Sequence, residues 1–337
     1  MRTLRVSFVI CICLLLTFSI PATDNSFKLD FDGDGRTDLA LYREGSRDIS
    51  VAPQPSYWFY LNTNNGRWGA IHWGRTLDVP APADYDGDGK TDVGIYRWWL
   101  FDIGDTNEYW LGKNGGYEVL NYEWEPSYYK FSRNYVGDAR AEIAHLYKIN
   151  ISQDPTVPCY LSVYFIGDNR DNTIRKTVGD TCNVNPTPVP GDYDNDGHSE
   201  IAVFNNHLFK VWFAPYSSGY TTPATTQFLD VDFPAVGDYD GDGKTDFAGT
   251  RAQNGRLVWR IKKSSDGSET VTDFGYSTDK PVPGDYDGDG KTDIAIWRPS
   301  DGGWWIMYSG NGSVSNWYFG LPTDTPLAAP VIPFDPS

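Results

Sequence analysis

One short acidic segment recurs along almost the whole chain. The segment GDYDGDGKTD occupies residues 284–293, and the same ten residues occupy 237–246. A period of about 50 residues indicates one supersecondary unit repeated in tandem. The first Asp of the six related clusters is, in order, Asp30, Asp84, Asp138, Asp192, Asp238 and Asp285, with separations of 54, 54, 54, 46 and 47 residues.

Each unit has the sequence pattern of four short strands. In the last unit the runs IAIWR, WWIMYS and VSNWYFG are separated by Gly, Ser, Asn, Asp and Pro, which is typical of strands joined by turns. The short stretch before each acidic cluster, as in KPVPGD, supplies the fourth strand. Helical periodicity is almost absent, so we predict an all-β chain.

Four antiparallel strands in each tandem unit predict a β-propeller of four-stranded blades. Six blades are favoured by the six units, and a strand from the tail after Pro326 leaves seven open. A β-solenoid is the rival, although it normally has shorter and more uniform rungs. We expect one propeller domain over residues 23–337, with units at about 26–79, 80–133, 134–187, 188–233, 234–280 and 281–337.

The acidic clusters have the spacing of a calcium loop. Carboxylates stand at relative positions 1, 3, 5 and 9, Gly stands at position 6, and the backbone carbonyl of position 7 is expected to point inward. Calcium prefers numerous oxygen ligands of this kind, whereas Mg²⁺ demands a compact octahedron. Asp and Gly also form turns without any metal. Five intact copies nevertheless favour about five Ca²⁺ ions, each held between the first and second strands of a blade.

The predicted ligands fall into five sets. They are Asp30, Asp32, Asp34, Arg36 and Asp38; Asp84, Asp86, Asp88, Lys90 and Asp92; Asp192, Asp194, Asp196, His198 and Glu200; Asp238, Asp240, Asp242, Lys244 and Asp246; and Asp285, Asp287, Asp289, Lys291 and Asp293. The basic residues and His198 would contribute only their backbone carbonyls.

The third unit departs from this pattern. Its segment GDARAEIAHLY keeps Asp138 and Glu142 but lacks the four central residues of the other clusters. Two carboxylates do not build the site, so we predict a plain tight turn without calcium there.

The N-terminus predicts export. Arg2 and Arg5 precede the apolar run 6–20, and small Ala22 suits a cleavage site. This pattern is typical of a signal peptide over residues 1–22, because the run is short for a membrane span of about 20 residues. A membrane anchor is the weaker alternative. We expect a secreted or cell-surface protein, with the periplasm as another destination, present as a monomer and not inserted in a membrane.

The cysteine count predicts a disulfide, and the net charge limits which partners are expected. Cleavage would leave two cysteines, Cys159 and Cys182, for which an oxidising compartment favours a disulfide over two buried thiols. Losing Arg2 and Arg5 changes the formal charge from −17 to −19, since 26 basic then face 45 acidic residues. With no basic cluster, nucleic acid is excluded as a favoured partner.

The repeats resemble the FG-GAP/VCBS family, which includes the β-propeller of integrin α chains and many exported bacterial proteins. The likeness rests on Phe274–Gly275, on Phe319–Gly320 and on the run PVPGDYDGDGKTDIAIWRPS at 281–300. It implies a calcium-binding propeller but no particular ligand, because such repeats serve many functions. Integrin propellers have seven blades, whereas six units are counted here.

The function expected from these features is non-enzymatic recognition or adhesion, with a glycan or an extracellular protein as ligand and no cofactor other than calcium. The long connections at 43–57 and 148–159 would lie on the face opposite the calcium loops. Trp98, Trp99, Trp304 and Trp305 suggest glycan stacking, although one member of each pair should pack between blades. The alternatives are an exported polysaccharide-cleaving enzyme, for which His145 is the candidate residue, and a purely structural scaffold.

Overall fold

The computed structural model describes residues 28–46, 52–97, 107–113, 116–122, 129–133, 140–150, 160–167, 173–180, 187–212 and 225–328. Every regular element in these ranges is a β-strand. No helix there is long and apolar enough to cross a membrane. The predicted signal peptide, the predicted Cys159–Cys182 pair, the Trp98–Trp99 pair and Asp138 lie outside the described residues.

The described strands form six four-stranded antiparallel sheets, one for each repeat unit. Numbered along the chain, the strands are β1 (Leu39–Arg43), β2 (Pro55–Leu61), β3 (Trp68–Arg75), β4 (Val79–Pro80), β5 (Gly94–Arg97), β6 (Asn107–Lys113), β7 (Gly116–Tyr122), β8 (Tyr129–Arg133), β9 (Glu142–Asn150), β10 (Tyr160–Gly167), β11 (Thr173–Asp180), β12 (Thr187–Pro188), β13 (Ile201–Asn205), β14 (Leu208–Trp212), β15 (Thr225–Phe228), β16 (Phe233–Pro234), β17 (Phe247–Gln253), β18 (Arg256–Lys262), β19 (Glu269–Tyr276), β20 (Lys280–Pro281), β21 (Ile294–Arg298), β22 (Gly303–Met307), β23 (Val314–Tyr318) and β24 (Thr325–Leu327).

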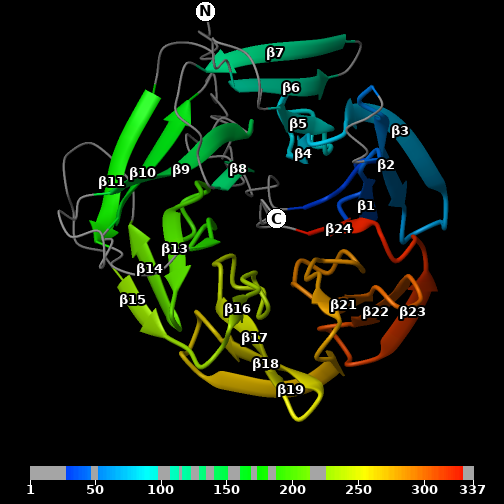
Figure 1. Cartoon of the computed structure of the whole chain (residues 1–337). Helices are drawn as coiled ribbons and strands as arrows, with labels where there is room; N and C mark the ends of the chain where they lie inside the picture. Colours follow the sequence, from blue (N-terminus) through cyan, green and yellow to red (C-terminus); the bar gives the residue numbers. More distant parts are fainter. Residues whose placement is uncertain are drawn as a thin grey trace, which may run out of the picture.

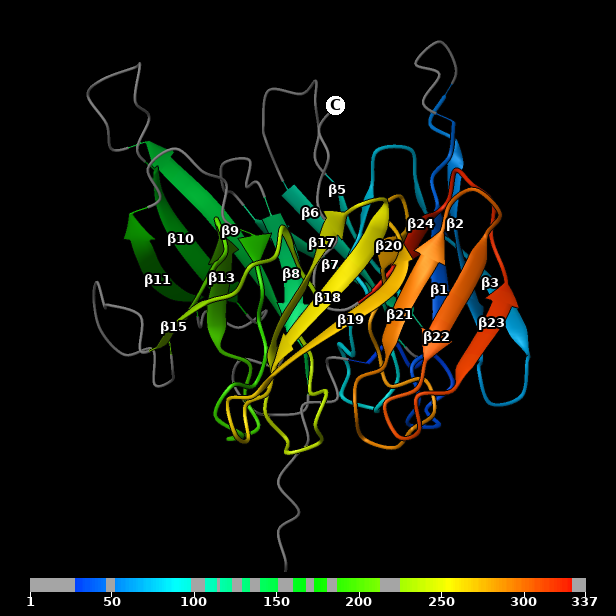
Figure 2. The same ribbon diagram turned by 90° about the horizontal axis from the view of Figure 1, so that it is seen from below.

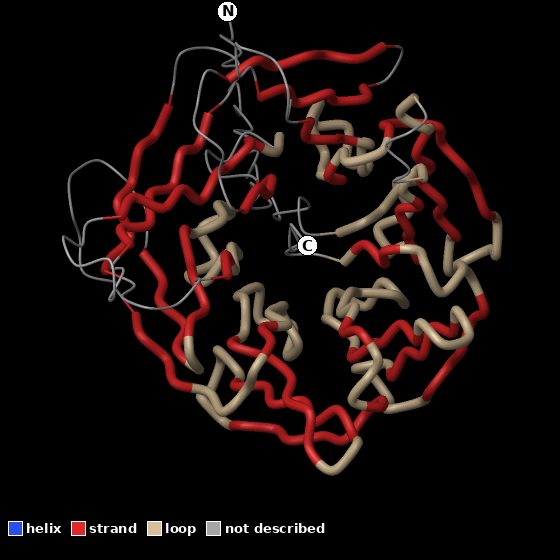
Figure 3. Tube along the Cα trace, viewed as in Figure 1, coloured by secondary structure: helices blue, strands red, loops and turns tan. Residues whose placement is uncertain are grey.

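The sheets are arranged around a ring, as in a β-propeller (Figures 1 and 3). In five sheets the strands follow one another as a meander, for example β20-β21-β22-β23. The shortest strand of such a sheet lies nearest the centre, and the last strand lies at the rim (Figure 1). Seen from the side, the strands cross the thickness of the disc, so the connections gather on its two faces (Figure 2).

The remaining sheet joins the two ends of the described chain. Its order is β24-β1-β2-β3, with Ala40 of β1 opposite Leu327 of β24 and Tyr42 opposite Thr325. The innermost strand of the first sheet thus comes from the end of the chain, as Figure 1 shows near the centre of the ring. The tail supplies the missing strand of the first repeat, and this pairing closes the ring.

The hydrophobic core lies between neighbouring sheets. One cluster joins Leu39 and Leu41 of β1 to Trp297 and Trp304 of the sheet before it, all fully buried. A second cluster joins Trp58 of β2 to Ile95 of β5. Trp304 is therefore a core residue and not a platform for glycans, because alternate residues of a strand face opposite sides of the sheet.

The Phe-Gly pairs of the repeat hold such tryptophans in place. The indole Nε1 of Trp304 donates to the carbonyl of Phe319 at 2.9 Å, and that of Trp259 donates to the carbonyl of Phe274 at 2.9 Å. The following Gly320 has a φ of 113°, a conformation that favours glycine over residues with a side chain. The Phe-Gly signature thus marks the end of the outermost strand, since Phe274–Gly275 lie at an irregularity near the end of β19 and Phe319–Gly320 directly follow β23.

Candidate metal loops

Four of the five complete acidic loops connect the innermost strand of a sheet to the strand beside it, and the loop at 30–38 directly precedes β1. The loop at 84–92, for example, connects β4 to β5. In four loops a Tyr at position 2 anchors the loop, because its buried hydroxyl donates to a carbonyl four residues earlier, as Tyr286 does to Val282 at 2.7 Å. The first loop has Phe31 at this position, and its ring stacks on Tyr60 instead. In the sheet that follows this first loop, the innermost strand is β24, from the other end of the chain.

The first carboxylate of each loop organises the turn. In the first loop Asp30 accepts N–H bonds from Gly33, Asp34 and Gly35 at 2.6, 3.2 and 2.7 Å. Gly35 at position 6 has a φ of 84°, and the equivalent glycines of the other four loops have φ values of 84° to 87°. The sharp turn expected at position 6 is therefore present in all five loops.

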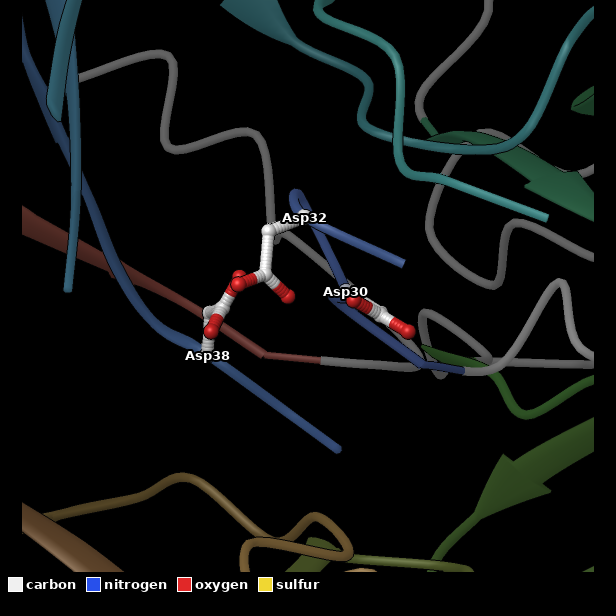
Figure 4. A group of neighbouring side chains, drawn as sticks. All are labelled: Asp30, Asp32 and Asp38. Carbon is white, nitrogen blue, oxygen red and sulfur yellow. The ribbon is translucent and has the colours of Figure 1, made fainter. Parts of the chain in front are cut away.

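Three carboxylates come together in every complete loop. In each group one oxygen per residue lies within 4.8 Å of the others, and Figure 4 shows the group of the first loop. Four groups combine positions 1, 3 and 9, whereas the last combines positions 1, 3 and 5. The groups are Asp30, Asp32 and Asp38; Asp84, Asp86 and Asp92; Asp192, Asp194 and Glu200; Asp238, Asp240 and Asp246; and Asp285, Asp287 and Asp289.

The remaining predicted carboxylate ligands, at position 5 in four loops and at Asp293 in the last, are not members of these groups. The carboxylate at position 5 accepts the N–H of the residue at position 7, as Asp34 does from Arg36 at 3.0 Å and Asp242 from Lys244 at 2.9 Å. Lys90, His198 and Lys291 donate in the same way, each at 2.9 Å. This bond fixes the backbone of position 7 in the turn. The role of its carbonyl as a metal ligand stays a prediction.

In four of the five loops the carboxylate at position 9 is the most buried of its set, with Asp92 as the exception, and its surroundings differ between loops. One oxygen always accepts the N–H of position 2, at 2.6 to 3.0 Å. The second oxygen of Asp246 accepts the N–H of Ser264 at 2.6 Å, and that of Asp293 accepts the N–H of Ser309 at 2.8 Å. By contrast, Asp38 Oδ1 and Glu200 Oε1 are buried with no hydrogen-bond partner among the described residues.

Burial without a partner raises the proton affinity of these groups. Desolvation raises the pKa of Asp38 to about 8 and that of Glu200 to about 9, and the N–H bond from position 2 only partly offsets it. The pKa of Asp246 is raised less, to about 6, since Ser264 donates to it. A buried anion without a partner costs free energy, which a bound cation removes. The residues present therefore fit a hard divalent cation.

Sequence reasoning missed the groups that support the loops from the neighbouring hairpin. Asn62 donates through Nδ2 to Asp32, Ser265 Oγ donates to Asp240 at 2.6 Å, and Ser264 Oγ donates to Asp242 at 2.9 Å. All three lie between the third and fourth strands of their sheets. Their shared signal was a short polar residue within three residues after the third strand, which sequence reasoning treated as an ordinary turn.

The residues considered for other functions are dispersed. His72 lies on β3, its ring 5.2 Å from that of Tyr57, and His207 bonds the carbonyl of Val231 through Nδ1. His145 belongs to β9, in another sheet. Trp305 is half-buried, with Arg298 over its ring at 5.3 Å. The described residues of the third unit begin at Arg140, so its predicted turn at Asp138 is not described.

Comparison with known proteins supports the repeat assignment. The family model described as "FG-GAP-like repeat" matches residues 30–95 and 238–296, which include four of the five complete acidic loops. No curated protein matches the chain. Among solved structures, a putative 6-phosphogluconolactonase from Bacteroides fragilis is similar with a TM-score of 0.38 and 11% identity, covering 87% of this chain and 96% of its own. A TM-score this low supports neither a shared fold nor a shared function.

Proposed function

We propose that this chain, whose sequence contains FG-GAP-like repeats and whose sheets form a propeller, is a secreted calcium-binding recognition module. In this proposal the propeller has six blades and binds about five Ca²⁺ ions in its acidic loops. Its ligand is a glycan or an extracellular protein, and it performs no catalysis. The charged and apolar N-terminal segment supports export, and the lack of a basic cluster argues against nucleic acid.

The observation that carries the calcium proposal is the pair of buried carboxylate oxygens without partners. Asp38 is 1% exposed and Glu200 is fully buried, and each has a free oxygen in a group with two further carboxylates. A turn that needed no ion would gain nothing from this arrangement, since desolvated charge destabilises the fold. Calcium suits the groups better than Mg²⁺ because it accepts many oxygen ligands in flexible geometry.

The recognition proposal rests on the opposite face of the disc. Because the strands are antiparallel, the connections between second and third strands lie on the face away from the acidic loops. In the first three sheets these connections span 44–54, 98–106 and 151–159, whereas in the last three they span only 206–207, 254–255 and 299–302. Long variable loops on a rigid scaffold are common binding elements, so we place the ligand over the first three sheets.

Calorimetric titration of the chelator-treated protein with CaCl₂ tests the metal proposal. We expect binding of about five ions, and the variant Asp32→Asn with Asp38→Asn should bind one ion fewer. The substitution Asp301→Asn, in a turn on the opposite face, is the control and should leave the stoichiometry unchanged. A wild-type protein that binds no calcium would refute the proposal.

A glycan array and a cell-binding assay test the recognition proposal. Replacing residues 151–159 by the two-residue Asn-Gly connection found at 254–255 should abolish the binding detected with the wild type. The calcium stoichiometry of this variant serves as its folding control. Replacing 299–302 in the same way should have little effect, and equal losses from both replacements would contradict the assignment of the ligand face.

A further inference from the structure

The acidic loops contact one another in an order that differs from their order in the sequence. The loop at 192–200 is bonded to the loop at 238–246, which is bonded to 285–293. That loop is in turn bonded to 30–38, from the other end of the chain, and 30–38 is bonded to 84–92. The five complete loops therefore form one unbroken row, and the ring closure lies inside it.

The same bond links every adjacent pair in this row. The N–H of the residue at position 8 donates to the carbonyl of the Asp at position 1 in the preceding loop, at 2.6 to 2.7 Å. At two junctions a side chain adds a second bond. The hydroxyl of Thr37 accepts the N–H of Asp285 at 3.0 Å, and that of Thr91 accepts the N–H of Asp30 at 2.8 Å. We call this pairing of position 8 with position 1 the threonine clamp.

Close packing makes the clamp sensitive to its neighbours. A Cβ placed on Gly284 would lie 2.7 Å from Thr37 Cγ2, and glycines 191 and 237 face Thr245 and Thr292 at similar distances. The junction to the third unit is built differently, because Ala83 precedes Asp84 there and Ala141 stands in place of the threonine. Its backbone bond, Ala141 N–H to the Asp84 carbonyl, is kept at 2.7 Å. Small residues on both sides thus replace the Gly and Thr pair.

Charged side chains reinforce the same contacts. At three of the four junctions, the side chain at position 7 lies on the glycine at position 4 of the preceding loop. A Cβ on Gly33 would be 2.9 Å from Lys90 Cε, and one on Gly288 would be 2.9 Å from Arg36 Cγ. At three junctions of the row, a cationic side chain (Lys90, Lys291 or Arg36) thus lies over the acidic turn before it, which reduces the repulsion between adjacent loops.

The clamp connects two predicted ligands directly. Asp285 is a ligand of one site, and Thr37, which bonds both its N–H and its carbonyl, is covalently joined to Asp38 of the next site. Fixing Asp285 on an ion therefore fixes the backbone next to Asp38. The buried oxygens of Asp38 and Glu200 that lack a partner favour cation binding in the row, and this observation is independent of the number of acidic residues. A site that is already ordered binds its ion with a smaller entropic cost.

We propose that the five metal sites fill cooperatively as one row, running from 192–200 to 84–92 through the ring closure, with the threonine clamps as the coupling elements. This inference rests on the proposed calcium function. Because the junction between 285–293 and 30–38 lies inside the row, ion binding stabilises the joining of the two chain ends. Thr37 and Thr91 are positioning residues in this scheme and contact no ion.

A calcium titration followed by calorimetry and by tryptophan fluorescence tests the coupling. The wild type should bind with a Hill coefficient clearly above one. Removing an interior site with Asp287→Asn and Asp289→Asn should weaken the remaining sites by about fivefold or more, the usual scale of coupling between sites. Removing the terminal site with Asp86→Asn and Asp88→Asn should weaken them much less, because only one neighbour is lost.

The clamp itself is tested by a pair of substitutions. Gly284→Ala should force Thr37 away and lower the Hill coefficient, and adding Thr37→Ala should restore part of it, because the smaller side chain relieves the clash and keeps the backbone bond to Asp285, as Ala141 keeps its bond to Asp84 beside Ala83. Thr270→Ala on the exposed part of β19 is the control. Calcium binding at independent sites, with no effect of Gly284→Ala, would overturn the coupling and leave the calcium function intact. Absence of calcium binding in the wild type would overturn both.

Discussion

The loops at 30–38 and 285–293 have the same acidic spacing and lie next to each other, yet they treat the ninth carboxylate differently. In the loop at 285–293 both oxygens of Asp293 accept N–H bonds, from Tyr286 and from Ser309. In the first loop Asp38 Oδ1 has no partner among the described residues. Identical ligand spacing therefore gives one turn in which both oxygens of the ninth carboxylate have partners and burial raises its pKa to about 7, and another in which one oxygen has no partner and burial raises the pKa to about 8.

The difference originates in the neighbouring hairpin. Ser309 stands two residues after the third strand of its sheet, and Thr63 stands at the same place in the first sheet. The hydroxyl of Thr63 lies 3.1 Å from the carbonyl of Tyr286 in the adjacent loop and 3.4 Å from the carbonyl of Thr37 in its own loop, and no bond from Thr63 to Asp38 is found among the described residues. The hairpin of the first sheet thus supports its neighbour. Metal dependence is consequently decided by the residues around the loop as much as by its carboxylates.

Withdrawal of calcium should have the largest effect. Each site that is saturated about a hundredfold above its Kd adds about 2.7 kcal/mol, so we expect excess EDTA to lower the Tm by roughly 5–10 °C or more. Asp32→Asn should abolish more of this calcium-dependent gain than Asp287→Asn, since the first loop is the less satisfied one. Differential scanning calorimetry with and without CaCl₂ checks both points, and equal losses would break the comparison.

The pH dependence of the metal-free protein should be the next largest effect. The folded chain holds protons on Asp38 up to about pH 8 and on Glu200 up to about pH 9, whereas the unfolded chain releases them near pH 4. The native state then binds more protons, so stability falls as pH rises from about 4 to 9. Asp246 contributes to this fall only up to about pH 6.

Chemical denaturation in EDTA at several pH values measures this slope. Glu200→Gln should flatten the fall between pH 6 and 9, and Asp246→Asn should leave that part unchanged. With calcium bound, the fall should disappear in the wild type, because the cation keeps the carboxylates ionised. A metal-free protein that becomes more stable toward pH 9 would contradict the assignment of buried, unpartnered carboxylates.

Amide substitutions should separate the two loops by the sign of their effect. In EDTA at pH 8, Asp38→Asn removes a buried charge and keeps one oxygen for the N–H of Phe31, so the free energy of unfolding should rise. In Asp293→Asn the new amide NH₂ faces one of the two N–H groups, of Tyr286 and Ser309, that the carboxylate accepts from. The free energy of unfolding should therefore fall by about 1–3 kcal/mol. Urea denaturation checks this pair. A shift of the same sign in both variants would show that the two environments are equivalent.

The smallest effect should come from the exposed hydroxyl of Ser309. It lies 3.4 Å from both carboxylate oxygens of Asp289, while the backbone N–H of Ser309 makes the stronger bond to Asp293. Ser309→Ala keeps that N–H and should lower the free energy of unfolding by only about 0.5 kcal/mol. A larger loss, seen in urea denaturation, would show that the hydroxyl and not the backbone satisfies the loop.

Much of the fold follows from local sequence signals. The period of the acidic clusters predicted one sheet for each unit, and the short apolar runs predicted its strands, because both signals depend on neighbouring residues. The glycine at position 6 predicted a turn that the φ of Gly35 confirms. The threonine at position 8 also recurs in four of the five loops, but nothing in a single repeat indicates that it bonds to another one.

The sequence by itself determined the unit, the number of its copies and the carboxylates available to a cation. Only the tertiary structure decided which loops are neighbours, because ring closure brings residues 30–38 beside 285–293. It also decided which anions remain without partners, since the environments of Asp38 and Asp293 depend on how adjacent hairpins pack. Spacing along a chain fixes what a loop contains, whereas desolvation and hydrogen bonding depend on what surrounds it in space.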